Sequence, residues 1–78
     1  MASSVYNDIM SGKSDTNIRF ADMQNLLISK GFICRVKGDH FIYRKAGIPE
    51  IVNIQPLGNK AKPYQVKQIR NLFLKYGI

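Results

Sequence analysis

Two strand-like runs joined by a tight turn occupy residues 32–45, which read FICRVKGDHFIYRK. Residues 32–37 and 40–45 are rich in β-branched and aromatic side chains, and Gly38-Asp39 between them is a typical two-residue hairpin loop. A loop of this length fixes the register, so Lys37 is expected to face His40 and Cys34 to face Tyr43. The stretch therefore predicts an antiparallel hairpin around which the rest of the chain is arranged.

Side chains alternate along a strand, so the predicted register sorts the hairpin into two faces. The face expected to point toward the core holds Phe32, Cys34, Val36, Phe41 and Tyr43. The opposite face holds Ile33, Arg35, Lys37, His40, Ile42 and Arg44. The chain's single histidine is thus expected among three cations, on the side of the sheet that faces solvent.

Helical patterns flank this hairpin on both sides. Apolar residues at helical spacing predict one helix from Phe20 or Ala21 to Lys30 and a second that starts at Pro63 and ends at Gly77. After a looser turn over residues 46–49, Ile51–Gln55 is expected to form a third strand with Val52 and Ile54 facing inward. The predicted fold class is α+β: helix, three antiparallel strands, helix, with both helices on one sheet face.

Residues 1–17 form a separate N-terminal segment, which the pattern describes as either a short helix or a loose arm. Val5, Tyr6, Ile9 and Met10 would suit one or two helical turns ending at Gly12. Residues 18–78 are expected to be one continuous domain.

Composition narrows the classes of partner. In 78 residues, twelve Lys and Arg against five Asp and Glu leave a net charge of +7. This favours a polyanion, RNA or DNA before an acidic protein or a membrane surface. A single cysteine, Cys34, excludes an internal disulfide, and no Cys/His cluster predicts a metal site. We expect a cytoplasmic protein with no membrane span and no cofactor.

His40 is the first candidate for chemistry. A lone histidine beside a turn is most often a solvated polar residue, but here Lys37, Arg35 and Arg44 should surround it. An anionic ligand on this face would meet the imidazole, which titrates near neutrality as a general acid or base must.

The second candidate is the segment Asn59–Tyr64, at the start of the last helix. A helix N-terminus attracts phosphate, and Lys60, Lys62 and Lys67 add positive charge. A solvated loop that merely leads into the helix is an equal alternative. Of the aromatic residues, Tyr64 remains open as a base-stacking platform, whereas Phe41, Tyr43 and Phe73 are better explained as core.

Few enzyme mechanisms fit these residues. The sequence holds no paired-carboxylate site, phosphate-binding glycine loop or Ser/His/Asp set. RNA, however, carries its own nucleophile in the 2′-hydroxyl, so one base and several cations suffice to cleave it. His40 with Arg35, Lys37 and Arg44 would supply those parts.

Residues 12–78 resemble the HicA toxins of bacterial type II toxin–antitoxin modules. The resemblance is carried by residues 11–15 (SGKSD), 17–20 (NIRF), Leu26-Leu27 with Gly31-Phe32, residues 37–44 (KGDHFIYR), 53–56 (NIQP) and 58–67 (GNKAKPYQVK). It implies a fold like the double-stranded-RNA-binding domain and an mRNA-cleaving, growth-arresting toxin that a HicB-type antitoxin holds inactive. The family's catalytic histidine corresponds to His40.

Two positions depart from the family's pattern: Asp39 replaces the usual Ser, and Phe41 replaces a second His. The sequence thus predicts a metal-independent endoribonuclease with His40 as general acid or base. The alternative is a non-catalytic RNA-binding module that uses the same basic face, and a protein-binding adaptor is a third reading.

Overall fold

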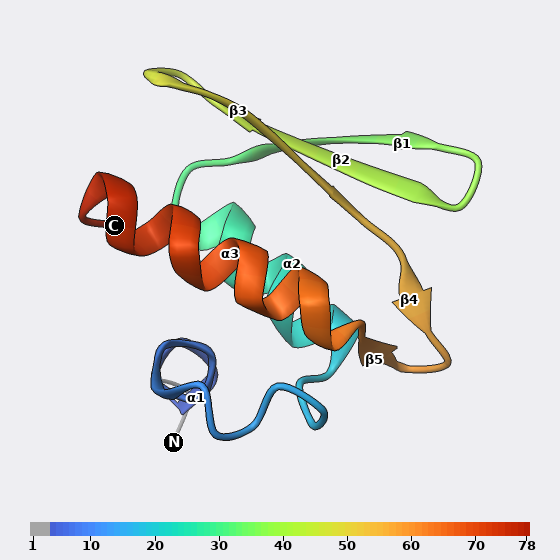
Figure 1. Ribbon diagram of the computed structural model, residues 1–78. Helices are drawn as coiled ribbons and strands as arrows, with labels where there is room; N and C mark the ends of the chain where they lie inside the picture. Colours follow the sequence, from blue (N-terminus) through green and yellow to red (C-terminus); the bar gives the residue numbers. More distant parts are fainter. Residues whose placement is uncertain (1–3) are drawn as a thin grey trace.

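The computed structural model describes residues 4–78, which form three layers (Figure 1). A three-stranded antiparallel sheet covers the helices α2 (Phe20–Ser29) and α3 (Pro63–Tyr76), and α1 (Ser4–Ser11) lies on the far side of these helices from the sheet. The sheet order is β1 (Ile33–Lys37), β2 (His40–Lys45), β3 (Ile48–Ile54). The predicted α+β class and element order are confirmed.

The β1–β2 hairpin has the predicted register. Lys37 pairs with His40, and Cys34 pairs with Tyr43. Gly38 has a φ of +63°, while Asp39 has a negative φ, the pattern of a type II′ turn with glycine at its first central position. The turn thus sets His40 as the first residue of β2, on the outer sheet face.

The third strand is longer than predicted. The turn is confined to Ala46 and Gly47, and β3 begins at Ile48 rather than Ile51. The expectation of a loose turn over residues 46–49 was wrong because Pro49 lies inside a strand at the edge of the sheet, where a missing N–H is tolerated. Val52 and Ile54 face inward as predicted.

A second, very short hairpin connects the sheet to α3. Its strands are β4 (Pro56–Leu57) and β5 (Lys60–Ala61), which the sequence pattern did not indicate. The N–H of Ala61 donates to the carbonyl of Ile18 (2.8 Å), and the N–H of Phe20 donates to the carbonyl of Asn59 (3.0 Å). These bonds fasten the start of α2 beside the start of α3.

The core lies between the sheet and the two long helices, with Tyr43, Met23, Leu27, Ile69 and Phe73 almost wholly buried. The inward hairpin face is less completely buried than predicted. Cys34 packs against the core as expected, but it is only half-buried. Val36 is 58% exposed, because it lies near the tip of the hairpin, beyond the cover of the helices.

The N-terminal segment contains a helix that belongs to this core. Ile9 of α1 is fully buried, and the Tyr6 ring stacks on Phe73 at 6.0 Å between centroids. Arg70 of α3 donates to the carbonyl of Ile9 (3.0 Å) and forms a double hydrogen bond with Asp15. Of the two readings left open, the short helix is the one found. Residues 1–3 of that segment lie outside the described residues.

Among residues 4–78, no helix is long and apolar enough to cross a membrane.

Candidate functional site

His40 is contacted at both of its ring nitrogens by side chains from the end of β3 and the residue that follows it. Its Nδ1 lies 3.0 Å from Oδ1 of Asn53, and its Nε2 lies 3.4 Å from Nε2 of Gln55. The His40 side chain is 46% exposed, so it remains open to a ligand on the outer sheet face. A histidine oriented at both nitrogens is more than a solvated polar residue.

The amide of Gln55 connects the imidazole to two charged groups. Its nitrogen donates to Oδ2 of Asp39 (3.2 Å), and its oxygen accepts from Nζ of Lys62 (3.3 Å). Asp39 also places Oδ1 3.7 Å from Nε2 of His40. The site therefore combines the β1–β2 turn, the end of β3 and the residue before α3.

The end of β3 is fixed by a buried glutamine of α3. The N–H of Gln55 donates to Oε1 of Gln65 (3.1 Å), and Nε2 of Gln65 donates to the carbonyl of Asn53 (3.4 Å). Gln65 is 4% exposed, and a buried amide left without hydrogen-bond partners would lower the stability of the fold. The helix thereby positions the strand segment that carries both histidine partners.

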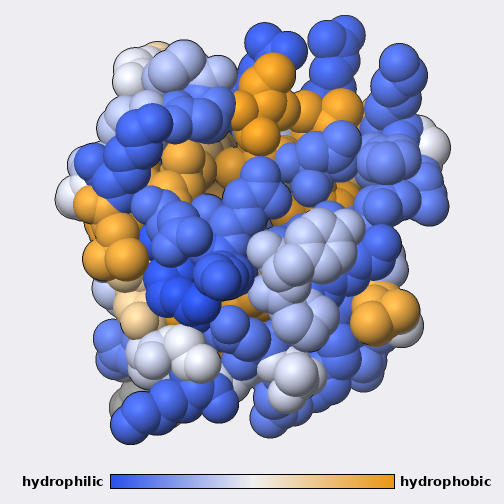
Figure 2. All heavy atoms as spheres, in the orientation of Figure 1, coloured by the Kyte–Doolittle hydropathy of each residue, from blue (hydrophilic) through white to orange (hydrophobic). Residues whose placement is uncertain are grey.

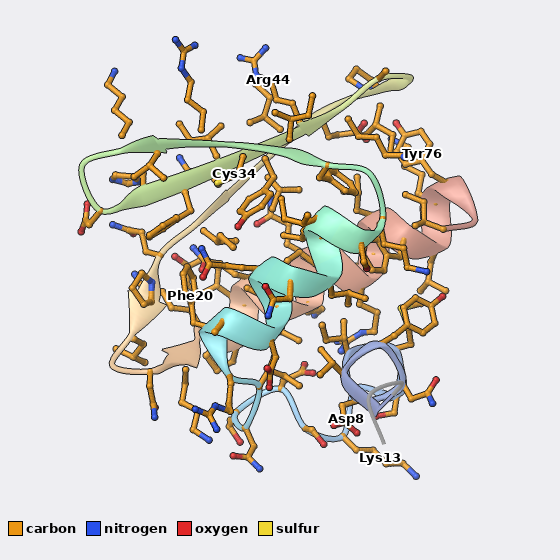
Figure 3. The ribbon with its side chains drawn as sticks, turned by 180° about the vertical axis from the view of Figure 1, so that it is seen from behind. Asp8, Lys13, Phe20, Cys34, Arg44 and Tyr76 are labelled. Atoms are coloured by element: carbon orange, nitrogen blue, oxygen red, sulfur yellow. The ribbon has the colours of Figure 1, made fainter. Side chains whose placement is uncertain are left out.

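The three predicted cations of the hairpin all stand on the outer face and are exposed. Lys37 is the cross-strand partner of His40, Arg35 pairs with Ile42, and Arg44 pairs with Ile33. Arg44 points away from the helices in Figure 3. Figure 2 shows hydrophilic side chains standing out from the sheet end of the molecule, with apolar atoms between them. Three cations therefore share the sheet face with the imidazole, which stays exposed.

The lysines predicted at the start of α3 do not form one cluster, because each has different surroundings. Lys62 joins the His40 network through Gln55, whereas Lys60 donates to Oδ1 of Asn17 (2.5 Å) on another side of the molecule. Lys67 is exposed on α3. Pro63 has no N–H and that of Gln65 already donates to the Lys62 carbonyl (2.9 Å), so this helix N-terminus offers a phosphate fewer donors than the sequence suggested.

The four candidate aromatic residues differ in how far they are buried. Tyr43 and Phe73 are buried, and burial raises the pKa of the Tyr43 hydroxyl to about 12. Phe41 is half-buried and meets Phe20 edge to face at 5.2 Å between centroids. Tyr64 is 64% exposed, so it is the aromatic side chain of this group that a nucleotide base could reach.

Three residues of the site were not predicted from the sequence: Asn53, Gln55 and Gln65. Extending the strand alternation from Val52 and Ile54 would have placed Asn53 and Gln55 on the outer face with His40. Gln65 could not have been found this way, because its role depends on how α3 meets the sheet. Among residues 4–78, no group of three or more His, Cys, Asp and Glu side chains is placed to hold a metal ion.

Comparison with known proteins gives no match to a family model, a curated protein or a solved structure.

Proposed function

We propose that this chain is a metal-independent endoribonuclease that cuts mRNA and arrests growth, as its resemblance to the HicA toxins implies. The observation that carries the proposal is the environment of His40. This sole histidine is open to solvent, is oriented at both ring nitrogens, and shares its sheet face with Arg35, Lys37 and Arg44. A base beside several cations is what cleavage by the RNA's own 2′-hydroxyl needs.

The proposed cleavage needs no other reagent, because the proton that His40 removes is returned to the leaving group. His40 takes the proton of the 2′-hydroxyl as O2′ bonds to phosphorus, and the bond from phosphorus to O5′ breaks. The imidazolium then returns the proton to the departing O5′, directly or through water. The products are a 2′,3′-cyclic phosphate and a free 5′-hydroxyl. Lys37, the cross-strand neighbour of His40, and Lys62, which is bonded to the same Gln55 amide, are the candidates to stabilise the charged phosphate.

The short hairpin favours single-stranded RNA as the substrate. A domain that binds double-stranded RNA contacts two successive minor grooves, partly with a longer loop between its first two strands. Here that loop is the two-residue turn Gly38-Asp39. Single-stranded RNA lying across the open sheet face can be bound without a long loop between β1 and β2.

Expression of the wild-type chain and of His40→Ala, each without antitoxin, tests the proposal. Wild type should arrest growth and cut a reporter mRNA, and the purified variant should cut RNA about 10²–10⁴-fold more slowly, the usual contribution of a general base. His40→Ala should keep its unfolding midpoint, because the side chain is exposed. Equal cleavage by both proteins would rule out His40 as the catalyst.

The same experiment separates the alternative, a non-catalytic RNA-binding module. Such a module would bind RNA in a gel-shift assay and show the same lack of cleavage with and without the imidazole.

The proposed protein partner is a HicB-type antitoxin that covers His40. Ile33 is 75% exposed and Ile42 is half-buried, and both lie on the outer face that carries Arg35, Lys37 and Arg44. Apolar side chains interspersed with cations on one face suit an acidic partner with apolar side chains. Ile33→Ser should weaken binding of the cognate antitoxin and leave RNA cleavage intact. A complex in which His40 stays open to solvent would point instead to inhibition at a distance.

A further inference from the structure

The charges at the edge of the site determine which nitrogen of His40 carries the proton. Lys62 can only donate hydrogen bonds and the Asp39 carboxylate can only accept them. Gln55 lies between these groups, so its amide oxygen must face Lys62 and its NH₂ must face Asp39. The orientation of the Gln55 amide is therefore fixed by two unambiguous partners.

The orientation of the Gln55 amide in turn determines the tautomer of the His40 ring. The Gln55 NH₂ lies 3.4 Å from Nε2 of His40, so in the neutral ring Nε2 must be the nitrogen with the lone pair. The proton then resides on Nδ1, which donates to Oδ1 of Asn53 at 3.0 Å. All four contacts agree with one tautomer.

We infer that Asn53 is a positioning residue that holds His40 in the Nδ1–H tautomer and so makes Nε2 the base that deprotonates the substrate. The inference rests on the proposed function only in naming the substrate, a 2′-hydroxyl. Gln55 occupies the place of that hydroxyl in the free protein, because it presents an N–H to the same lone pair. RNA displaces this N–H when it binds.

The network also accommodates the protonated ring. Once Nε2 has gained a proton it can no longer accept from Gln55, and the Asp39 carboxylate, 3.7 Å away, is placed to pair with it. Asp39 in the turn approaches the imidazole itself, Lys37 on β1 is the cross-strand partner of His40, and Lys62 before α3 reaches the Gln55 amide beside the ring. Asn53 is uncharged, so it orients the ring in both protonation states.

Nitrogen-15 NMR of the imidazole tests the tautomer directly, because the chain has one histidine and its ring signals need no assignment. At a pH where the ring is neutral, wild type should show Nδ1 protonated and Nε2 unprotonated. Asn53→Ala should shift the ring toward the Nε2–H form, which neutral histidine prefers in water. Asn25→Ala removes an exposed asparagine of α2 and should leave the wild-type spectrum unchanged.

Rates and pH profiles supply the second readout. Asn53→Ala should cut RNA about 10–100-fold more slowly, the range typical of a partner that orients a histidine through its second nitrogen in metal sites. Asn53→Asp keeps the acceptor, so it should retain the tautomer and most of the rate. Its acidic limb should move to higher pH, because a carboxylate stabilises the imidazolium.

The two readouts separate this inference from the proposed function. A wild-type ring protonated at Nε2, or an Asn53→Ala protein with the wild-type spectrum, would overturn the inference whether or not the protein cuts RNA. An Nδ1–H ring that depends on Asn53, in a protein without nuclease activity, would uphold the tautomer and refute the nuclease.

Discussion

Asp39 places a negative charge within 3.7 Å of the nitrogen proposed to act on a phosphodiester. Because the carboxylate is 78% exposed, its repulsion of a phosphate is screened by water. Asp39→Asn keeps an acceptor for Gln55 and removes the charge. We expect it to raise RNA affinity or cleavage about 1.5- to 5-fold at low salt, from the ~0.2–1 kcal/mol of an exposed charge pair.

Cleavage assays across a salt series check this prediction, since the gain should shrink as the ionic strength rises. Asp8→Asn is the matched control, because Asp8 lies at the opposite end of the molecule from Arg44 (Figure 3). A gain of the same size in both variants would attribute the effect to net charge rather than to the site.

Glu50 makes stability depend on pH in the acid range. Hydrogen bonds from Lys75 and Tyr76 lower the pKa of its carboxyl from 4.5 to about 2. Since the folded pKa is the lower one, this stabilisation is complete above the unfolded value and is lost as the pH falls toward 2. Glu50→Gln should therefore unfold at lower urea than wild type at pH 7, and the difference should disappear near pH 2. A difference that persists at pH 2 would contradict the assignment.

At the scale of elements, α1 is a structural part of the fold. Ile9 is fully buried between α1 and the long helices, so Ile9→Ala should lower the free energy of unfolding by about 2–5 kcal/mol. Asn7→Ala, at an exposed position of the same helix, should change it by less than about 0.5 kcal/mol. Urea unfolding measures both, and equal small losses would show that α1 is dispensable for stability.

The elements that could be predicted are those encoded by local pattern. The two-residue loop fixed the register of β1 and β2, and the apolar repeats with Pro63 and Gly77 located α3. The early start of β3 could not be predicted, because Pro49 is acceptable only at a sheet edge, and edges are a property of the assembled sheet. The position of α1 depended in the same way on tertiary packing.

The same distinction between local sequence pattern and tertiary packing applies to the residues of the candidate site. Strand alternation predicted that His40 and its cationic neighbours share the outer face. The hydrogen bonds that orient the imidazole come from Asn53 and Gln55, 13 and 15 residues further along the chain. They depend on the pairing of β2 with β3, and Gln65 depends on the docking of α3.

At the scale of the whole molecule, the net charge of +7 predicts RNA binding that weakens with salt. For a single strand, each phosphate contact adds about 0.7 to the slope of log affinity against log salt. Arg44→Gln should reduce this slope by about that amount, whereas Lys13→Gln, which removes the same charge far from the sheet face, should leave it unchanged (Figure 3). Fluorescence anisotropy with a short labelled RNA measures the slope, and equal slopes for both variants would argue against binding on the sheet.

The position of Gln65 predicts a response to heat that precedes global unfolding. Its amide holds the end of β3 from the first turn of α3, and helix ends open before the core does. We therefore expect warming to release Asn53 and Gln55 from this alignment while the sheet and the long helices are still packed. If the proposed nuclease activity depends on this alignment, cleavage should fall reversibly at temperatures below global unfolding, which RNA cleavage assays and circular dichroism over the same temperature range would check.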